Sequence, residues 1–176
     1  MIGFDYSIAE DKTIAVDVGY FFQDYKEETD ERDDDSGITA NAIFEKTFRR
    51  GSVSLTGSTG YFGAYLGAED LGLSIYYEAG LEADYNLTRR ITGDIFGSYR
   101  QDKYEDLDPV RRDKTTIGGA GLSYTYERWL SSNINFIIRA EYSYRNFDSN
   151  IETDYVENRG ILSITLTRSQ PYRSGN

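Results

Sequence analysis

The sequence alternates hydrophobic and polar residues over long stretches. From residue 71 to residue 85, odd positions carry Leu, Ile, Tyr and Ala, and even positions carry Gly, Ser, Tyr, Glu and Asp. Residues 134–145 repeat the pattern, with Ile134, Phe136 and Ile138 alternating with more polar neighbours. Because successive side chains of a β-strand point to opposite faces, this period of two predicts strands with one apolar and one polar face.

Nine such stretches follow one another along the chain. We predict strands at residues 2–8, 13–26, 38–48, 52–66, 71–85, 91–104, 114–126, 130–147 and 155–168. Short turns at 9–12, 49–51, 86–90 and 127–129 alternate with longer connections at 27–37, 67–70, 105–113 and 148–154. This alternation predicts an antiparallel, up-and-down order, with short turns at one end of the strands and long loops at the other.

The length of these strands indicates that the apolar face contacts lipid and the polar face contacts water. A strand of about 13 residues, tilted by about 40°, spans about 33 Å, more than the roughly 25 Å apolar band of an outer-membrane barrel. Basic residues on the apolar face, Lys26 and Lys46, lie near strand ends, where long side chains reach water. We therefore predict an all-β, transmembrane β-barrel with eight to ten strands in this chain, its apolar face toward lipid. Residues 1–176 form one domain, or the C-terminal part of a larger barrel.

Composition narrows the function further. The 176 residues include no histidine and no cysteine, which excludes Ser-His-Asp catalysis and metal sites built from these ligands. A net charge of -11 argues against nucleic acid as a partner. The 16 tyrosines and single tryptophan fit the aromatic girdles of a barrel. Candidate girdle residues are Tyr25, Tyr61, Tyr65, Tyr85, Tyr99, Tyr126, Trp129, Tyr142 and Tyr144.

The polar faces of the strands carry the charged residues that would line the barrel interior. The candidate lumen-lining residues are Asp17, Glu45, Glu78, Glu82, Asp84, Asp94, Arg100, Arg139, Glu141, Arg145, Glu157 and Arg159. We expect most of the acidic residues toward the short-turn end, and the arginines toward the middle or the loop end. In a narrow barrel these charges would pair across a filled interior, whereas in a wider barrel they would line water and favour cations.

Three local features yield narrower expectations. A loop centred near Ile151 places Arg145 opposite Glu157, as a cross-strand ion pair. The acidic run 27–37 does not match the EF-hand pattern and is expected to be a solvated loop, or a loose divalent-cation site beside lipopolysaccharide. The arginine pairs at 49–50 and 89–90 fit ordinary turns or contacts with phospholipid headgroups.

The end of the chain is similar to a known family. Residues 142–147 (YSYRNF), 156–166 (VENRGILSITL) and 171–173 (PYR) resemble the C-terminal strands of the bacterial outer-membrane family named Putative beta-barrel porin 2. The resemblance implies a larger barrel that acts as a passive pore or a secretion conduit, without catalytic residues. Barrel assembly machinery, an expected partner, usually reads a last strand ending in an aromatic residue, whereas this chain continues past Tyr172 to Asn176.

The leading interpretation is a porin-like channel or a structural barrel in the outer membrane, with no cofactor, no bound metal and no enzymatic activity. Outer-membrane lipid and lipopolysaccharide are its expected partners. Alternatives are a soluble, lipocalin-like ligand binder, part of a secretion conduit for a polymer such as polysaccharide, and a barrel enzyme using Glu82 and Asp94. Since an odd count of nine strands is unusual, closure stays open between a larger barrel, a small barrel and two copies of this chain.

Overall fold

The computed structural model describes residues 2–23, 35–66, 69–104, 109–126 and 134–168. These residues form nine strands, as the alternation predicts. The strands are β1 (Ile2–Ala9), β2 (Lys12–Gln23), β3 (Asp35–Phe48), β4 (Gly51–Leu66), β5 (Glu69–Asn86), β6 (Ile91–Tyr104), β7 (Arg111–Tyr126), β8 (Ile134–Ser149) and β9 (Tyr155–Arg168). No helix among the described residues is long and apolar enough to span a bilayer.

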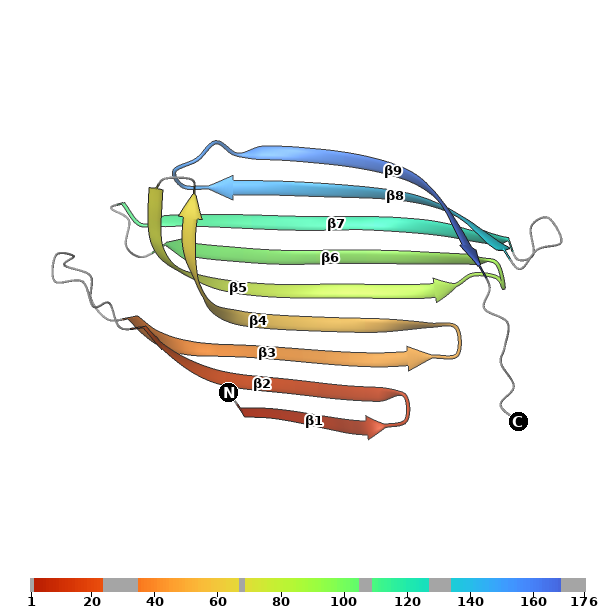
Figure 1. The fold of residues 1–176 in the computed structure, drawn as a ribbon, viewed down its shortest axis with the longest axis horizontal. Helices are drawn as coiled ribbons and strands as arrows, with labels where there is room; N and C mark the ends of the chain where they lie inside the picture. The colour runs from red at the N-terminus through yellow and green to blue at the C-terminus, as the bar shows by residue number, and fades with distance from the viewer. Residues whose placement is uncertain (1, 24–34, 67–68, 105–108, 127–133, 169–176) are drawn as a thin grey trace.

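Each strand pairs with the next one in antiparallel fashion, so the sheet order is the chain order (Figure 1). The register places side chains of the same face opposite each other on neighbouring strands: Leu55 is opposite Leu81, and Leu81 is opposite Gly97. At one end, β1–β2, β3–β4 and β5–β6 are joined by short turns. The fold is therefore an all-β, up-and-down meander.

Several strand boundaries differ from the prediction; β3, for example, begins at Asp35 rather than at residue 38, and β8 ends at Ser149 rather than at residue 147. β7 begins at Arg111 rather than at residue 114, and β5 begins at Glu69 rather than at residue 71. In both cases charged residues that look like loop sequence continue the ladder, and in β7 they do so because Arg111 and Asp113 neutralise each other on one face. The expected strand ends at residues 24–26 and 130–133, and most of the acidic run 27–37, lie outside the described residues.

The register divides the sheet into two faces that we name the polar face and the apolar face. The polar face is that of Glu78 and Asp94, and the apolar face is that of Ala79 and Ile95. Tyr104 is the one hydrophobic side chain that is buried among the described residues. Large apolar side chains are instead exposed, as at Leu162 (73%). The apolar side chains of this sheet therefore do not pack into a core of their own.

The sheet is open within the described residues. β1 pairs only with β2, and β9 pairs only with β8. Because antiparallel strands reverse direction at each step, the first and ninth strands run the same way (Figure 1). They cannot close on each other with antiparallel pairing.

The β4–β5 hairpin leaves the sheet at the loop end (Figure 1). The β3–β4 ladder ends at Ala40 opposite Thr59, while β4 and β5 stay paired to their tips, with an irregularity between residues 63 and 65. At the bend the Tyr61 ring lies 4.2 Å from the Phe21 ring, centroid to centroid. Tyr61, one of the candidate girdle residues, therefore packs against Phe21 of β2 at the bend.

Candidate functional site

The structure places all twelve candidate residues on the polar face. Directly paired antiparallel residues point to the same face, so rows of partners can be followed across the sheet. One such row runs from Asp17 through Asn41, Ser58 and Glu78 to Arg100. The other candidates fall in the neighbouring rows of this face: Glu45, Glu82, Asp84, Asp94, Arg139, Glu141, Arg145, Glu157 and Arg159.

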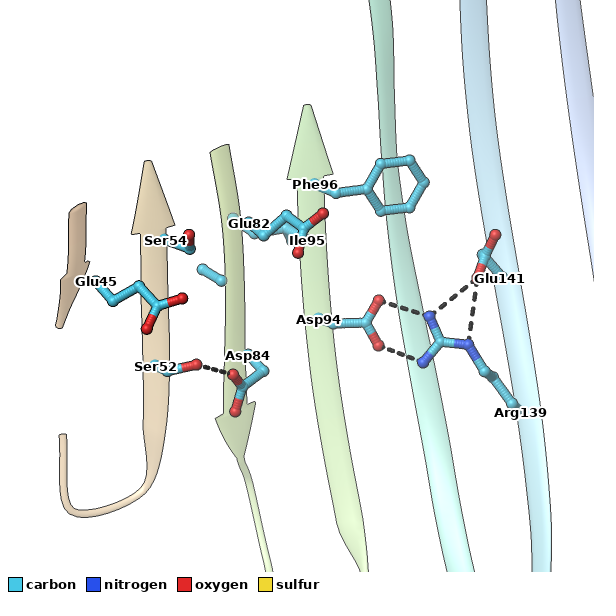
Figure 2. Close-up of a pocket in the computed structure, with 11 residues that line it drawn as sticks. Glu45, Ser52, Ser54, Glu82, Asp84, Asp94, Ile95, Phe96, Arg139 and Glu141 are labelled. Atoms are coloured by element: carbon cyan, nitrogen blue, oxygen red, sulfur yellow. Dashed lines mark hydrogen bonds and ion pairs between the residues drawn. The ribbon is translucent and has the colours of Figure 1, made fainter. Parts of the chain in front are cut away.

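A pocket of about 430 Å³ lies at the short-turn end of this face. Its carboxylates come from neighbouring strands and are drawn in Figure 2. They belong to Glu45, Glu82, Asp84, Asp94 and Glu141. Ser52 Oγ donates a hydrogen bond to Asp84 Oδ1. Among the described residues, no group of three or more His, Cys, Asp or Glu side chains is placed to hold a metal ion.

Arg139 neutralises part of this pocket (Figure 2). Its guanidinium donates to both oxygens of Asp94, at 2.6 and 2.8 Å, and to Glu141 Oε2 at 2.9 Å. The bridge to Asp94 crosses β7 above Gly121, where an added Cβ would lie 2.6 Å from Asp94 Oδ2 and 2.7 Å from Arg139 Nη2. Glycine therefore makes room for an ion pair between β6 and β8. The arginines of this face were expected mostly toward the middle or the loop end, and Arg139 departs from that tendency because it lies near the short-turn end of β8, opposite Ser123.

A second pocket, of about 480 Å³, lies toward the loop end of the same face. Arg100 donates to both oxygens of Asp102, at 2.9 to 3.1 Å, and lies 3.5 Å from Glu78 Oε2. Arg111 is held in the same way by Asp113 and also contacts Glu152, 2.5 Å away. The Arg111 and Asp113 side chains are only 10% and 6% exposed, so this pair is well shielded from water.

The sequence analysis missed Asp102, Arg111 and Asp113, although a simple signal marks them. Three strands carry an arginine followed two residues later by a carboxylate: Arg100-Gln-Asp102, Arg111-Arg-Asp113 and Arg139-Ala-Glu141. A spacing of two puts both side chains on one face of a strand. In all three cases the arginine Nε donates to that carboxylate, at 2.9 to 3.2 Å.

Charge is distributed unevenly across the polar face. Among the residues whose side chains the structure describes, the β1–β5 half carries six carboxylates and no basic side chain. These carboxylates are Asp5, Asp17, Glu45, Glu78, Glu82 and Asp84. The β6–β9 half carries five arginines and five carboxylates, namely Arg100, Arg111, Arg139, Arg145, Arg159, Asp94, Asp102, Asp113, Glu141 and Glu157. One half of the face is therefore strongly negative, and the other is balanced.

A comparison with family models matches residues 66–168, more than half of the chain, to Putative beta-barrel porin 2. The chain belongs to this family. The match spans the β5–β9 part of the sheet, which contains all three Arg-X-carboxylate motifs. No curated protein and no solved structure matches the chain. Membership of a porin-like barrel family favours a role without catalysis.

One expected contact within this porin-family segment is not formed. Arg145 is opposite Glu157 in the β8–β9 ladder, as predicted. The two described side chains make no ion pair, however, and the Arg145 guanidinium lies over the Tyr155 ring, 5.8 Å from its centroid. Glu157 is exposed at the edge strand. The register was therefore right, while the ion pair was wrong, because water competes for an exposed carboxylate and the neighbouring ring offers Arg145 an alternative partner.

Proposed function

We propose that this chain forms part of the wall of an outer-membrane β-barrel through which small ions and polar solutes diffuse passively. The observation that supports the proposal most strongly is the contrast between the two faces of one sheet. The polar face holds two pockets and the salt bridges described above, while the apolar face exposes side chains such as Tyr20 (69%) and Ile164 (63%).

This contrast argues against the soluble ligand binder. A soluble barrel buries its apolar face inside, and burying one large apolar side chain contributes about 1.5–3 kcal/mol. Here the side chains that bridge strands on the polar face are charged, since Arg139 on β8 reaches Asp94 on β6 across the intervening strand. An apolar surface spread over all nine strands is expected of a wall that contacts lipid.

The direction of the strands bears on how the wall is completed. β1 and β9 run the same way, so only an odd number of additional strands closes the barrel with antiparallel pairs throughout. Two copies of this sheet inserted in one orientation would instead meet along two parallel seams. We therefore favour a larger barrel completed by an odd number of further strands over a dimer of this sheet or a small nine-stranded barrel.

The uneven charge supports a preference for cations. Ions passing along the β1–β5 half meet carboxylates from Asp5 to Asp84, of which Glu78 alone, among the described ion pairs, has a basic partner, Arg100 on β6 at 3.5 Å. Rings or rows of carboxylates favour cations in water-filled pores. In the β6–β9 half, the opposite charges of each Arg-X-carboxylate pair cancel most of the electric field that the pair exerts on a passing ion. These pairs therefore contribute to structure more than to ion preference.

Single-channel recording tests this function. The protein, purified from membranes in detergent, is added to a planar bilayer with KCl at different concentrations on the two sides. We expect stepwise, ohmic conductance with a reversal potential of the sign that indicates cation preference. Properly folded protein that inserts without conductance would refute the channel and indicate a filled barrel, and protein that stays soluble without detergent would refute the membrane assignment.

A further inference from the structure

A row of basic side chains lies at the short-turn end of the sheet. We name it the turn-end basic row, and it consists of Lys12, Lys46, Arg49, Arg50, Arg89 and Arg90. Two acidic residues, Glu10 and Asp11, share these turns, which leaves a surplus of positive charge. None of the six basic side chains makes an ion pair with another described residue. The row is therefore a cationic edge on a chain whose net charge is -11.

The pairing of two lysines in this row is costly by itself. Lys12 and Lys46 are direct cross-strand partners on the apolar face. Like charges directly opposite each other destabilise a sheet. The Lys46 ammonium lies over the Phe48 ring, 4.7 Å from its centroid, which orients it without neutralising it. An anion from outside the chain would remove this repulsion.

The turns that carry the row are tied together. Each turn offers a backbone carbonyl to the first strand of the next hairpin: Thr47 N–H on β3 donates to Asp11 O at 2.8 Å, and Asn86 N–H on β5 donates to Arg50 O at 2.6 Å. Thr125 N–H completes the series by donating to Arg90 O at 2.8 Å. The turns therefore hold their basic residues side by side, and little ordering is needed to bind an extended anionic surface.

The row borders an uncharged band. The ladder row of Lys46 reaches β6 at Ile95, and the next charged residue on that face of β6 is Lys103, eight residues on. Eight residues span about 26 Å along a strand, or about 20 Å across the membrane at a tilt of about 40°, which is most of the roughly 25 Å apolar band of an outer-membrane barrel. Aromatic side chains that are half exposed, Phe48 and Tyr85, lie where this band meets the row.

From this arrangement we propose that the turn-end basic row binds the phosphate groups of anionic phospholipids in the leaflet on the short-turn side. The inference rests on the proposed membrane location, because it places the band between Lys46 and Lys103 in the bilayer. A leaflet fits the row better than a compact ligand does, since the row extends along three turns and is flanked by exposed aromatic residues. Each basic residue at a lipid surface raises affinity by a factor of about five.

Native mass spectrometry tests the proposal. Protein purified from membranes is stripped of lipid and mixed with equal amounts of phosphatidylglycerol and phosphatidylcholine. We expect the unaltered chain to retain phosphatidylglycerol preferentially, and we expect K12Q/K46Q to reduce that preference by roughly 25-fold, a factor of about five for each lysine. The matched control R145Q/R159Q removes two positive charges from the polar face and should keep it. Equal losses in both variants, or no preference in unaltered protein that inserts into liposomes, would overturn the lipid site alone. Failure of the unaltered protein to insert would instead refute the proposed function.

Thermal unfolding gives an independent test, because the effect of Lys12→Gln on the Tm should change sign when anionic lipid is added. In neutral detergent, Lys12→Gln should raise the Tm because it removes the repulsion from Lys46. When phosphatidylglycerol is added, the same variant should gain less stability than the unaltered protein, so the order of the two Tm values reverses. If Lys12→Gln has the same effect with and without the anionic lipid, the lysine pair is not a phosphate site.

Discussion

Neutralising the acidic pocket at the short-turn end should reduce the cation preference of the channel. The variant E45Q/E82Q/D84N removes three carboxylates of the β1–β5 half and leaves the ion pair between Asp94 and Arg139 in place. These substitutions keep side-chain size nearly unchanged, so the pocket of about 430 Å³ should retain its shape.

The expected size of the effect follows from Coulomb's law. An ion passing the pocket lies about 8 Å from each carboxylate, which gives about 0.5 kcal/mol per charge in water and about 0.2 kcal/mol after screening in 0.1 M salt. Three charges then contribute about 0.7 kcal/mol, favourable for a cation and unfavourable for an anion. The cation-to-anion permeability ratio should therefore fall by about tenfold.

Reversal potentials in a KCl gradient measure this ratio. The effect should shrink to less than about twofold in 1 M salt, where the screening length is about 3 Å. The matched control E10Q/D11N/D148N also removes three negative charges, from the β1–β2 turn and from the end of β8 on the apolar face, and should change the ratio much less. An unchanged reversal potential in the pocket variant, or equal shifts in variant and control, would show that the polar face is not the ion path.

Four further substitutions test the packing of the two faces. Gly121→Leu should displace the salt bridge that crosses β7. Because that bridge is partly exposed, we expect the free energy of unfolding, measured by urea titration, to fall by only about 1 kcal/mol. An unchanged free energy of unfolding would mean that the bridge contributes nothing. Arg111→Met should cost about 2–4 kcal/mol by the same measurement, because it leaves a shielded carboxylate without its cation; a loss below about 1 kcal/mol would contradict the shielding. In lipid bilayers, Ala79→Lys on the apolar face should lower the free energy of unfolding by about 2–4 kcal/mol, whereas Ser98→Lys on the polar face should leave it nearly unchanged. The reverse order of the two effects would show that the polar face, and not the apolar face, contacts lipid.

The period-two alternation predicted the antiparallel all-β fold, the nine strands and the common face of the twelve candidate residues, but not that Arg111 and Asp113 belong to a strand. Because the side-chain period of a strand is fixed by backbone geometry, a residue such as Glu78 or Arg139 can be assigned to a face without knowing its neighbours. The register of β8 and β9 also followed from the sequence, since a loop centred near Ile151 sets Arg145 opposite Glu157.

The tertiary structure alone decided which charges meet. Which residue contacts which depends on register across several strands and on the bending of the sheet, and neither is encoded in the alternation itself. The bridge from Arg139 to Asp94 needs two ladders in fixed register and a glycine at position 121 between them. The departure of the β4–β5 hairpin from the sheet had no signal in the period, because a bent strand alternates in the same way as a flat one.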